Sequence, residues 1–191
     1  MRRLVKTTLL GLVVAVTLAT VPAQAGTQPY CGLSWGSLPE QHRVNSYATA
    51  SVENLRAGRH ECFDRIVVDL GADPQGRPAS NAIGYRVRYV SSVTDIETGG
   101  TIPIAGGAVL SIQVNAPAHD DELRPTYDPD DRLNAVSVDG FRTFRQVAFM
   151  GTFEGQTLVV LGVRGRLPFR VFVLDGPGDG ARLVIDIAHR W

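Results

Sequence analysis

The sequence is poor in the residues that build most metal, redox and catalytic sites. It has two cysteines, four histidines and a single lysine in 191 residues. None of the histidines (His42, His60, His119 and His189) shows an HxH, HExxH or HxxxH spacing, so no zinc site is predicted. No GxSxG elbow and no glycine-rich loop opening a helix is present. We therefore expect no metal, no cofactor and no enzymatic activity.

The chain also lacks an excess of basic residues and, after its N-terminal segment, any long apolar stretch. After residue 25 the chain carries 16 arginines and 19 acidic residues, a net charge near −3. This is not the basic excess of a general nucleic-acid binder, so no nucleic-acid partner is expected. After residue 21 no stretch of about 18 apolar residues without charge occurs, so no membrane span is predicted in the rest of the chain.

The first 25 residues have the pattern of a secretory signal. Arg2, Arg3 and Lys6 precede an uncharged apolar stretch, 9–21, and a small-x-small cleavage site ends at Ala25. The apolar stretch is shorter than the about 20 residues that a span needs, although an uncleaved anchor remains an alternative. We predict a signal peptide over 1–25 and a secreted, extracytoplasmic protein associated with the cell envelope.

The two cysteines, Cys31 and Cys62, both follow the predicted cleavage site. An even pair in an exported chain is typical of a disulfide. The bond would close a loop of about 30 residues, a constraint worth roughly 3–4 kcal/mol of stability. Two cysteines are too few for a structural zinc site.

The rest of the chain has the pattern of an all-β protein. After an extended N-terminal arm, 26–51, short apolar runs alternate with Gly- and Pro-rich turns every 8–15 residues over 52–191, which is typical of a two-sheet β-sandwich. A short helix is also considered at 118–124. A hairpin turn is expected at 154–156. The predicted strands are 52–57, 63–70, 84–90, 108–115, 135–138, 145–153, 157–163, 169–174 and 182–188.

One stretch of sequence occurs twice. DRIVVDL at 64–70 matches ARLVIDI at 181–187 position by position. Alternation along a strand sends the aliphatic residues of each copy to one face, which we expect to be core. The other face carries Arg65 and Asp69 in one copy and Arg182 and Asp186 in the other. This repeated stripe predicts either surface ion pairs or two equivalent binding faces.

These segments resemble the AMIN-like branch of the AMIN family, named for the N-terminal module of bacterial amidases and found in exported actinobacterial proteins. The resemblance covers about residue 31 to the C-terminus. The classical AMIN family implies a sandwich of two similar small sheets that binds peptidoglycan and localises a partner. No amidase or other catalytic domain follows within this sequence. The matching segments are 35–39, 58–69, 84–90, 151–155 and 182–187.

The resemblance and the arginine pattern together suggest a binding surface. Arg86 and Arg88 share one face of strand 84–90, with the tyrosines on the other. Arginine forks suit the carboxylates of peptidoglycan stem peptides. We expect Arg65, Arg86, Arg88 and Arg182 to contact a cell-wall polymer, with ordinary surface pairing as the alternative reading.

Other functions stay open at this point. The domain could instead hold another envelope protein, or, less in keeping with its motifs, act as a small-ligand carrier or hydrolase. A Ser-His-Asp triad assembles in space, so its presence is a question for the structure. Two acidic segments, 119–122 and 128–131, could attract calcium, although a charged solvated loop is the plainer interpretation.

Overall fold

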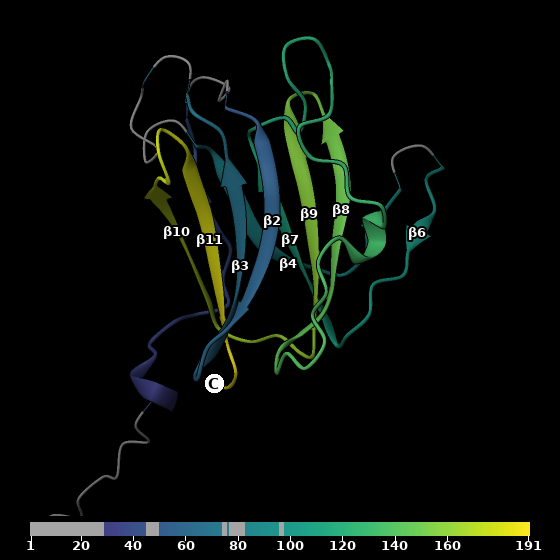
Figure 1. The fold of residues 1–191 in the computed structure, drawn as a ribbon. Coiled ribbons are helices and arrows are strands. Elements are labelled where there is room, and N and C mark those ends of the chain that lie inside the picture. Colours follow the sequence, from purple (N-terminus) through teal and green to yellow (C-terminus); the bar gives the residue numbers. More distant parts are fainter. Residues whose placement is uncertain (1–28, 45–49, 74–75, 77–82, 96–97) are drawn as a thin grey trace, which may run out of the picture.

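Two antiparallel β-sheets pack face to face in the computed structural model, which describes residues 29–44, 50–73, 76, 83–95 and 98–191 (Figure 1). The five-stranded sheet has the order β1-β4-β7-β9-β8, and the four-stranded sheet the order β10-β11-β3-β2. The strands β5 and β6 form a separate two-stranded ribbon. The all-β sandwich expected from the sequence is confirmed. None of the helices in these ranges is long and apolar enough to cross a membrane.

The strands agree closely with those predicted from alternation. Eight of the nine predicted strands are present, and the three strands that were not predicted, β1, β5 and β6, have only two or three residues each. The strands are β1 (Glu40–His42), β2 (Val52–Arg59), β3 (Phe63–Leu70), β4 (Tyr85–Val90), β5 (Val93–Thr94), β6 (Thr101–Ile102), β7 (Ala108–Val114), β8 (Phe144–Phe153), β9 (Gln156–Val163), β10 (Phe169–Asp175) and β11 (Ala181–Ala188), with short 3-10 turns η1 (Tyr30–Gly32) and η2 (Arg132–Asn134).

Two local predictions are wrong. The ninth strand, 135–138, is an irregular segment after η2, where the Ala135 N–H donates to the carbonyl of Val147 on the edge of β8. The short helix considered at 118–124 is a tight turn. Asp120 forms this turn, because its carboxylate accepts the backbone N–H groups of Glu122 and Arg124 and so competes with helical hydrogen bonding.

The predicted hairpin between β8 and β9 is confirmed. Glu154 and Gly155 both have positive φ, at 49° and 74°. Two such residues match the two-residue turn whose twist fits that of paired strands. β8 and β9 pair antiparallel up to Phe153 and Gln156, with a bulge between Phe149 and Thr152.

The core lies between the two sheets. Ile66, Val68 and Leu70 of β3 face it together with Leu183, Ile185 and Ile187 of β11, as the alternation predicts, and all six are buried. The outer face of the five-stranded sheet carries a smaller cluster under the β5-β6 ribbon, formed by Val93, Ala148 and Val160. The outer face of the four-stranded sheet has no such ribbon among the described residues.

The N-terminal arm runs along the open edge of β10. The predicted disulfide between Cys31 and Cys62 is confirmed and ties the arm to the turn between β2 and β3. Further along, the carbonyl of Gly36 accepts the N–H of Phe169, and the carboxylate of Glu40 accepts the N–H of Val171 at 3.1 Å. Both bonds occupy backbone groups of an edge strand that would otherwise be open to another chain.

Glu40 makes this edge sensitive to pH. Burial raises its pKa above the ordinary value of 4.5, against the weaker opposing effect of the Val171 hydrogen bond. The folded state therefore keeps a proton that the unfolded chain has lost, so the stability from this group falls as pH rises from about 4.5 through the folded pKa. We expect Glu40→Gln, which keeps an acceptor for Val171, to flatten this part of the profile. Urea unfolding at several pH values measures the free energy of unfolding of both proteins. The same dependence on pH in Glu40→Gln as in the wild-type protein would contradict this prediction.

Candidate functional site

The two matching strands lie side by side. β3 and β11 pair antiparallel, with Arg65 opposite Asp186 and Arg182 opposite Asp69. The interpretation as two equivalent binding faces is therefore wrong, since both copies of the stripe share the outer face of the four-stranded sheet. Antiparallel pairing of two Arg-Val-Asp stripes places each arginine across from the other strand's aspartate.

Arg65 and Asp186 form the centre of this face. The Arg65 Nε and Nη2 atoms donate to the two carboxylate oxygens of Asp186 at 2.6 and 2.9 Å. Arg170 of β10 approaches the same carboxylate from the other side, with its Nε 2.9 Å from Oδ2. The Asp186 side chain is fully buried although it lies on an outer face, because the two arginines cover it. The bidentate bonds of Arg65 and the two contacts of Arg170 with Oδ2 are charge-assisted and hold both guanidinium groups in place.

Aromatic rings frame the two guanidinium groups. Arg170 lies 4.6 Å from the ring centroid of Trp35 in the arm and 5.0 Å from that of Phe172. Arg65 lies 5.4 Å from Phe63 and 5.5 Å from Phe172. These are cation–π distances. We call this set, Trp35, Phe63, Arg65, Arg170, Phe172 and Asp186, the arginine–aromatic face.

Arg182 belongs to the same outer face but not to this cluster. The aspartate opposite it, Asp69, accepts two hydrogen bonds from Arg56 at 2.6 and 2.9 Å. Hydrogen bonding to Asp69 raises the pKa of Arg56, against the smaller opposing effect of burial. Arg182 instead donates from Nη2 to the carbonyl of Asp175, and its buried Nε has no hydrogen-bond partner among the described residues. Arg56 and Arg65 thus each form an ion pair with an aspartate on this outer face, as the alternative interpretation of surface pairing predicts. Arg182 bonds to a backbone carbonyl instead.

Arg86 and Arg88 lie on the opposite side of the molecule. They project from β4 onto the outer face of the five-stranded sheet, while Val87 between them is fully buried, as the alternation predicts. Both are exposed, and neither forms an ion pair with a described residue. The four arginines predicted as one contact set are therefore divided between two faces.

The residues of this face that sequence reasoning missed are Trp35, Phe63, Arg170 and Phe172. Their strand and arm segments were identified, but strand β10 has no counterpart of the duplicated stripe. The available signal was the alternation itself, which sends Arg170 and Phe172 to one face of β10. That signal became specific only once β10 was known to lie beside β11.

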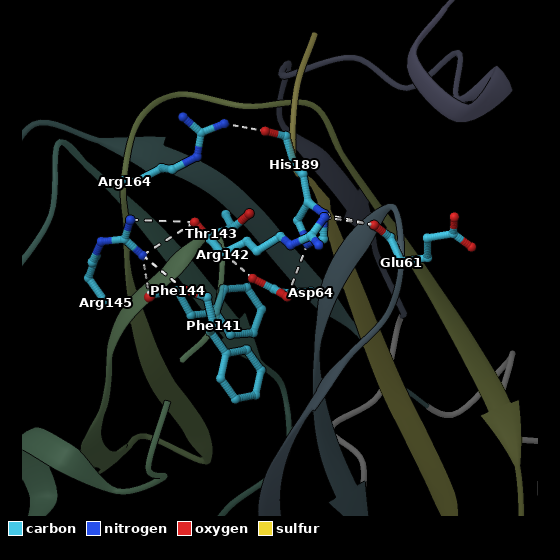
Figure 2. Close-up of polar contacts among 9 residues, drawn as sticks. All are labelled: Glu61, Asp64, Phe141, Arg142, Thr143, Phe144, Arg145, Arg164 and His189. Carbon is cyan, nitrogen blue, oxygen red and sulfur yellow. Dashed lines mark hydrogen bonds and ion pairs between the residues drawn. The ribbon is translucent and has the colours of Figure 1, made fainter. Parts of the chain in front are cut away.

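A second polar cluster lies at one end of the sandwich, where three segments meet (Figure 2). The Asp64 carboxylate accepts the N–H of Thr143 at 2.6 Å and contacts His189 Nε2 at 3.1 Å. His189 Nδ1 lies 3.1 Å from the carbonyl of Glu61, and Arg164 donates to the carbonyl of His189. The cluster joins the β2-β3 turn, the start of β8 and the end of β11.

The burial of this cluster indicates a structural role. The residue exposures are 0% for Asp64 and Thr143 and 4% for His189, and the buried Thr143 hydroxyl has no hydrogen-bond partner in the part of the chain that the structure describes. A nucleophile and its base must reach a substrate. Three sealed side chains do not offer that access, although an aspartate beside a histidine is part of the Ser-His-Asp arrangement.

The acidic side chains of segments 119–122 and 128–131 bond to groups within their own loops. Asp131 caps η2 through the N–H groups of Leu133 and Asn134, and the Asn134 side chain lowers the pKa of Asp131. Asp128 pairs with Arg132 at 2.7 Å. Within the part of the chain that the structure describes, no three His, Cys, Asp or Glu side chains come together as a group that could hold a metal ion.

The chain is similar over part of its length to a curated protein. The chain is 31% identical over 104 residues to the ferredoxin–NAD(+) reductase component of the p-cumate 2,3-dioxygenase system of Pseudomonas putida. The match covers 50% of this chain and 26% of that protein, so the chain spans about a quarter of the length of its curated relative.

A family match covers most of the fold. The model of the AMIN-like domain matches residues 50–189, which contain β2 to β11 and so the core strands of both sheets. The Cys31–Cys62 bond is typical of compartments outside the cytoplasm. The chain belongs to the AMIN-like domain family and is an envelope-associated module.

Proposed function

We propose that this protein is a non-catalytic, extracytoplasmic module that binds peptidoglycan through its arginine–aromatic face. The observation that carries the proposal is one buried carboxylate, Asp186, shared by two arginines that lie against three aromatic rings. The predicted signal segment, 1–25, lies outside the described residues, and its export function is part of the proposal.

The free donors of the two arginines suit stem-peptide carboxylates. Arg65 and Arg170 each use Nε and Nη2 on Asp186, so the Nη1 group of each has no described hydrogen-bond partner. Arginine recognises carboxylates through such parallel N–H groups. On the outward side of the four strands, four arginines, Arg56, Arg65, Arg170 and Arg182, outnumber three acids, Asp69, Asp186 and the exposed Glu53 in the bulge of β2, which leaves the face positive.

The rings of the same face suit the glycan. The C–H groups of a sugar ring pack against an aromatic surface by dispersion. Trp35, Phe63 and Phe172 are half-buried, so each ring retains exposed surface beside the arginines. A disaccharide-peptide unit could therefore contact rings and guanidinium groups together.

Preorganisation strengthens such a surface. Arginine side chains lose rotamer freedom when they are ordered by a ligand. Here Asp186 and the flanking rings already hold Arg65 and Arg170, so less entropy is lost on binding. The buried ion pair thus supports binding as well as folding.

The partial similarity to a reductase component does not favour dinucleotide binding. The dinucleotide fingerprint places the pyrophosphate at the start of an α-helix that follows a strand. Residues 29–44, 50–73, 76, 83–95 and 98–191 form no α-helix. The non-catalytic role is supported instead by the sealing of Asp64 and His189 from solvent.

Co-sedimentation with purified sacculi tests the proposal. We expect the wild-type protein to bind and Arg170→Glu to weaken binding at least about tenfold, which corresponds to about 1.4 kcal/mol. Arg88→Glu is the matched control, since it makes the same charge change at an exposed strand position on the other sheet. It should stay within about twofold of wild type.

Two outcomes would contradict this. Wild-type protein that stays in the supernatant would remove wall binding, and equal losses in both variants would remove the assignment of the face. Thermal midpoints of both variants show whether they are folded. Arg170→Glu leaves Asp186 bonded to Arg65, so the ion pair at the centre of the face survives.

A further inference from the structure

A groove lies far from the arginine–aromatic face, at the free edge of the other sheet. It has a volume of about 980 Å³ and runs between the β5-β6 ribbon and the end of β8. The loop from Ala118 to Leu133 contributes the remaining wall. A volume of this size is in the range of binding pockets.

Exposed apolar side chains gather at this groove. Six large hydrophobic side chains are exposed in the described part of the chain, and three of them line the groove: Leu123 at 74%, Phe153 at 59% and Leu133 at 42%. Single exposed apolar residues are common on protein surfaces. A group of them around one groove marks an interaction site.

The most exposed of the three is held in a strained backbone. Leu123 has a φ of 62°, in the left-handed region that favours glycine. The turn is fixed by the Leu123 N–H, which donates to the carbonyl of Asp120, and by the Asp120 carboxylate, which accepts two further N–H groups. Strained residues are kept where the surroundings enforce them, and they cluster at functional sites. Here the strain presents a leucine to solvent.

The floor of the groove is an irregular strand edge. β8 is the last strand of its sheet, and the η2 segment lies against its edge near Val147, whose carbonyl accepts the Ala135 N–H. Beyond that point a bulge between Phe149 and Thr152 interrupts the pairing with β9, and Gly151 in the bulge has a φ of 85°. Bulges occur at sheet edges and beside sites, where they redirect the backbone.

The chemistry of the lining favours a peptide over an anionic polymer. Its one arginine, Arg132, already pairs with Asp128 at 2.7 Å and lies over Phe149. Threonine hydroxyls of the β5-β6 ribbon also line it, at Thr94 and Thr101, whereas those of Thr98 and Thr152 already accept the N–H groups of Gly100 and Ala118. Hydroxyls and an open strand edge hydrogen-bond to peptide groups, whereas an acyl chain needs neither.

We propose that this groove binds an extended, uncharged apolar segment of a partner protein. The segment lies along the bulged edge of β8 and places its apolar side chains against Leu123, Leu133 and Phe153. This site is independent of the wall-binding face, so the module can hold a polymer on one side and a protein on the other.

Peptide display against the purified protein tests the site. Random nonapeptides are selected on wild-type protein, and their affinities are measured by fluorescence anisotropy. We expect uncharged apolar peptides to be enriched, and Leu123→Glu to weaken their binding at least tenfold. Leu38→Glu is the matched control, because Leu38 is 75% exposed and lies outside the groove. It should leave the affinity within twofold.

A second variant separates binding from folding. Leu123→Gly removes the side chain and suits the positive φ, so its thermal midpoint should not fall while peptide affinity does. The proposal is overturned if no apolar peptide is enriched or if the enriched peptides bind Leu123→Glu as well as wild type. Binding of a dansyl fatty acid that Leu123→Glu abolishes, without peptide binding, would assign the groove to lipids. None of these outcomes depends on wall binding.

Discussion

Asp64→Ala is expected to lower the free energy of unfolding by about 3 kcal/mol, because it leaves the buried Thr143 N–H without an acceptor and removes the carboxylate that the buried His189 ring contacts. The Thr143 N–H loses its bond of 2.6 Å, and the His189 ring loses its contact of 3.1 Å. Both partners are buried in the same cluster, so water does not replace the carboxylate. The loss is large because the cluster joins three segments that are distant in the chain.

The matched control lies on the same strand. Asp69→Ala removes an aspartate whose partner, Arg56, has a side chain 50% exposed. Exposed pairs contribute about 0–1 kcal/mol, so this variant should lose no more than that. Urea unfolding of both proteins measures the difference. Equal losses would mean that the Asp64 cluster does not have the structural role assigned to it.

Removal of the disulfide is the second large effect. The Cys31→Ser, Cys62→Ser double variant is expected to lose roughly 3–4 kcal/mol, since the bond closes a loop across a sequence separation of 31. The same bond fixes the arm that places Trp35 over Arg170. We therefore expect weaker sacculus binding as well as lower stability.

Reductant provides the internal control. Thermal unfolding of the wild-type protein should shift to lower temperature when dithiothreitol is added, whereas the double variant should not respond. A wild-type midpoint that reductant leaves unchanged would show that the arm and the domain are stable without the bond. Binding measured in the same two conditions separates the contribution of the arm from that of the sheet.

The sequence predicted which residues face inward but not which strands are neighbours. Alternation identified β3 and β11 and the inward set of each, because a two-residue period is a local property. Pairing is a long-range property, so the side-by-side arrangement of β3 and β11, and with it the Arg65–Asp186 bond, required the structure. For the same reason Arg86 and Arg88 were grouped with arginines that lie on the opposite face.

The errors in the loops have a different cause. At 118–124, one carboxylate, Asp120, accepts two backbone N–H groups and so stabilises a turn over a helix. Neither that choice nor the groove beside it follows from composition, because the groove walls come from the β5-β6 ribbon, β8 and the loop together. A site built from distant segments gives little signal in any one of them.

The central claim is that the arginine–aromatic face binds peptidoglycan, and side-chain NMR with a soluble disaccharide-peptide fragment tests it most directly. Titration of the fragment into the isotope-labelled protein should shift the indole N–H signal of Trp35 and the Nε–H signals of Arg65 and Arg170. The Nε–H signals of Arg86 and Arg88, on the other sheet, should stay in place. Shifts confined to Arg86 and Arg88, or no shifts at saturating fragment, would contradict the account.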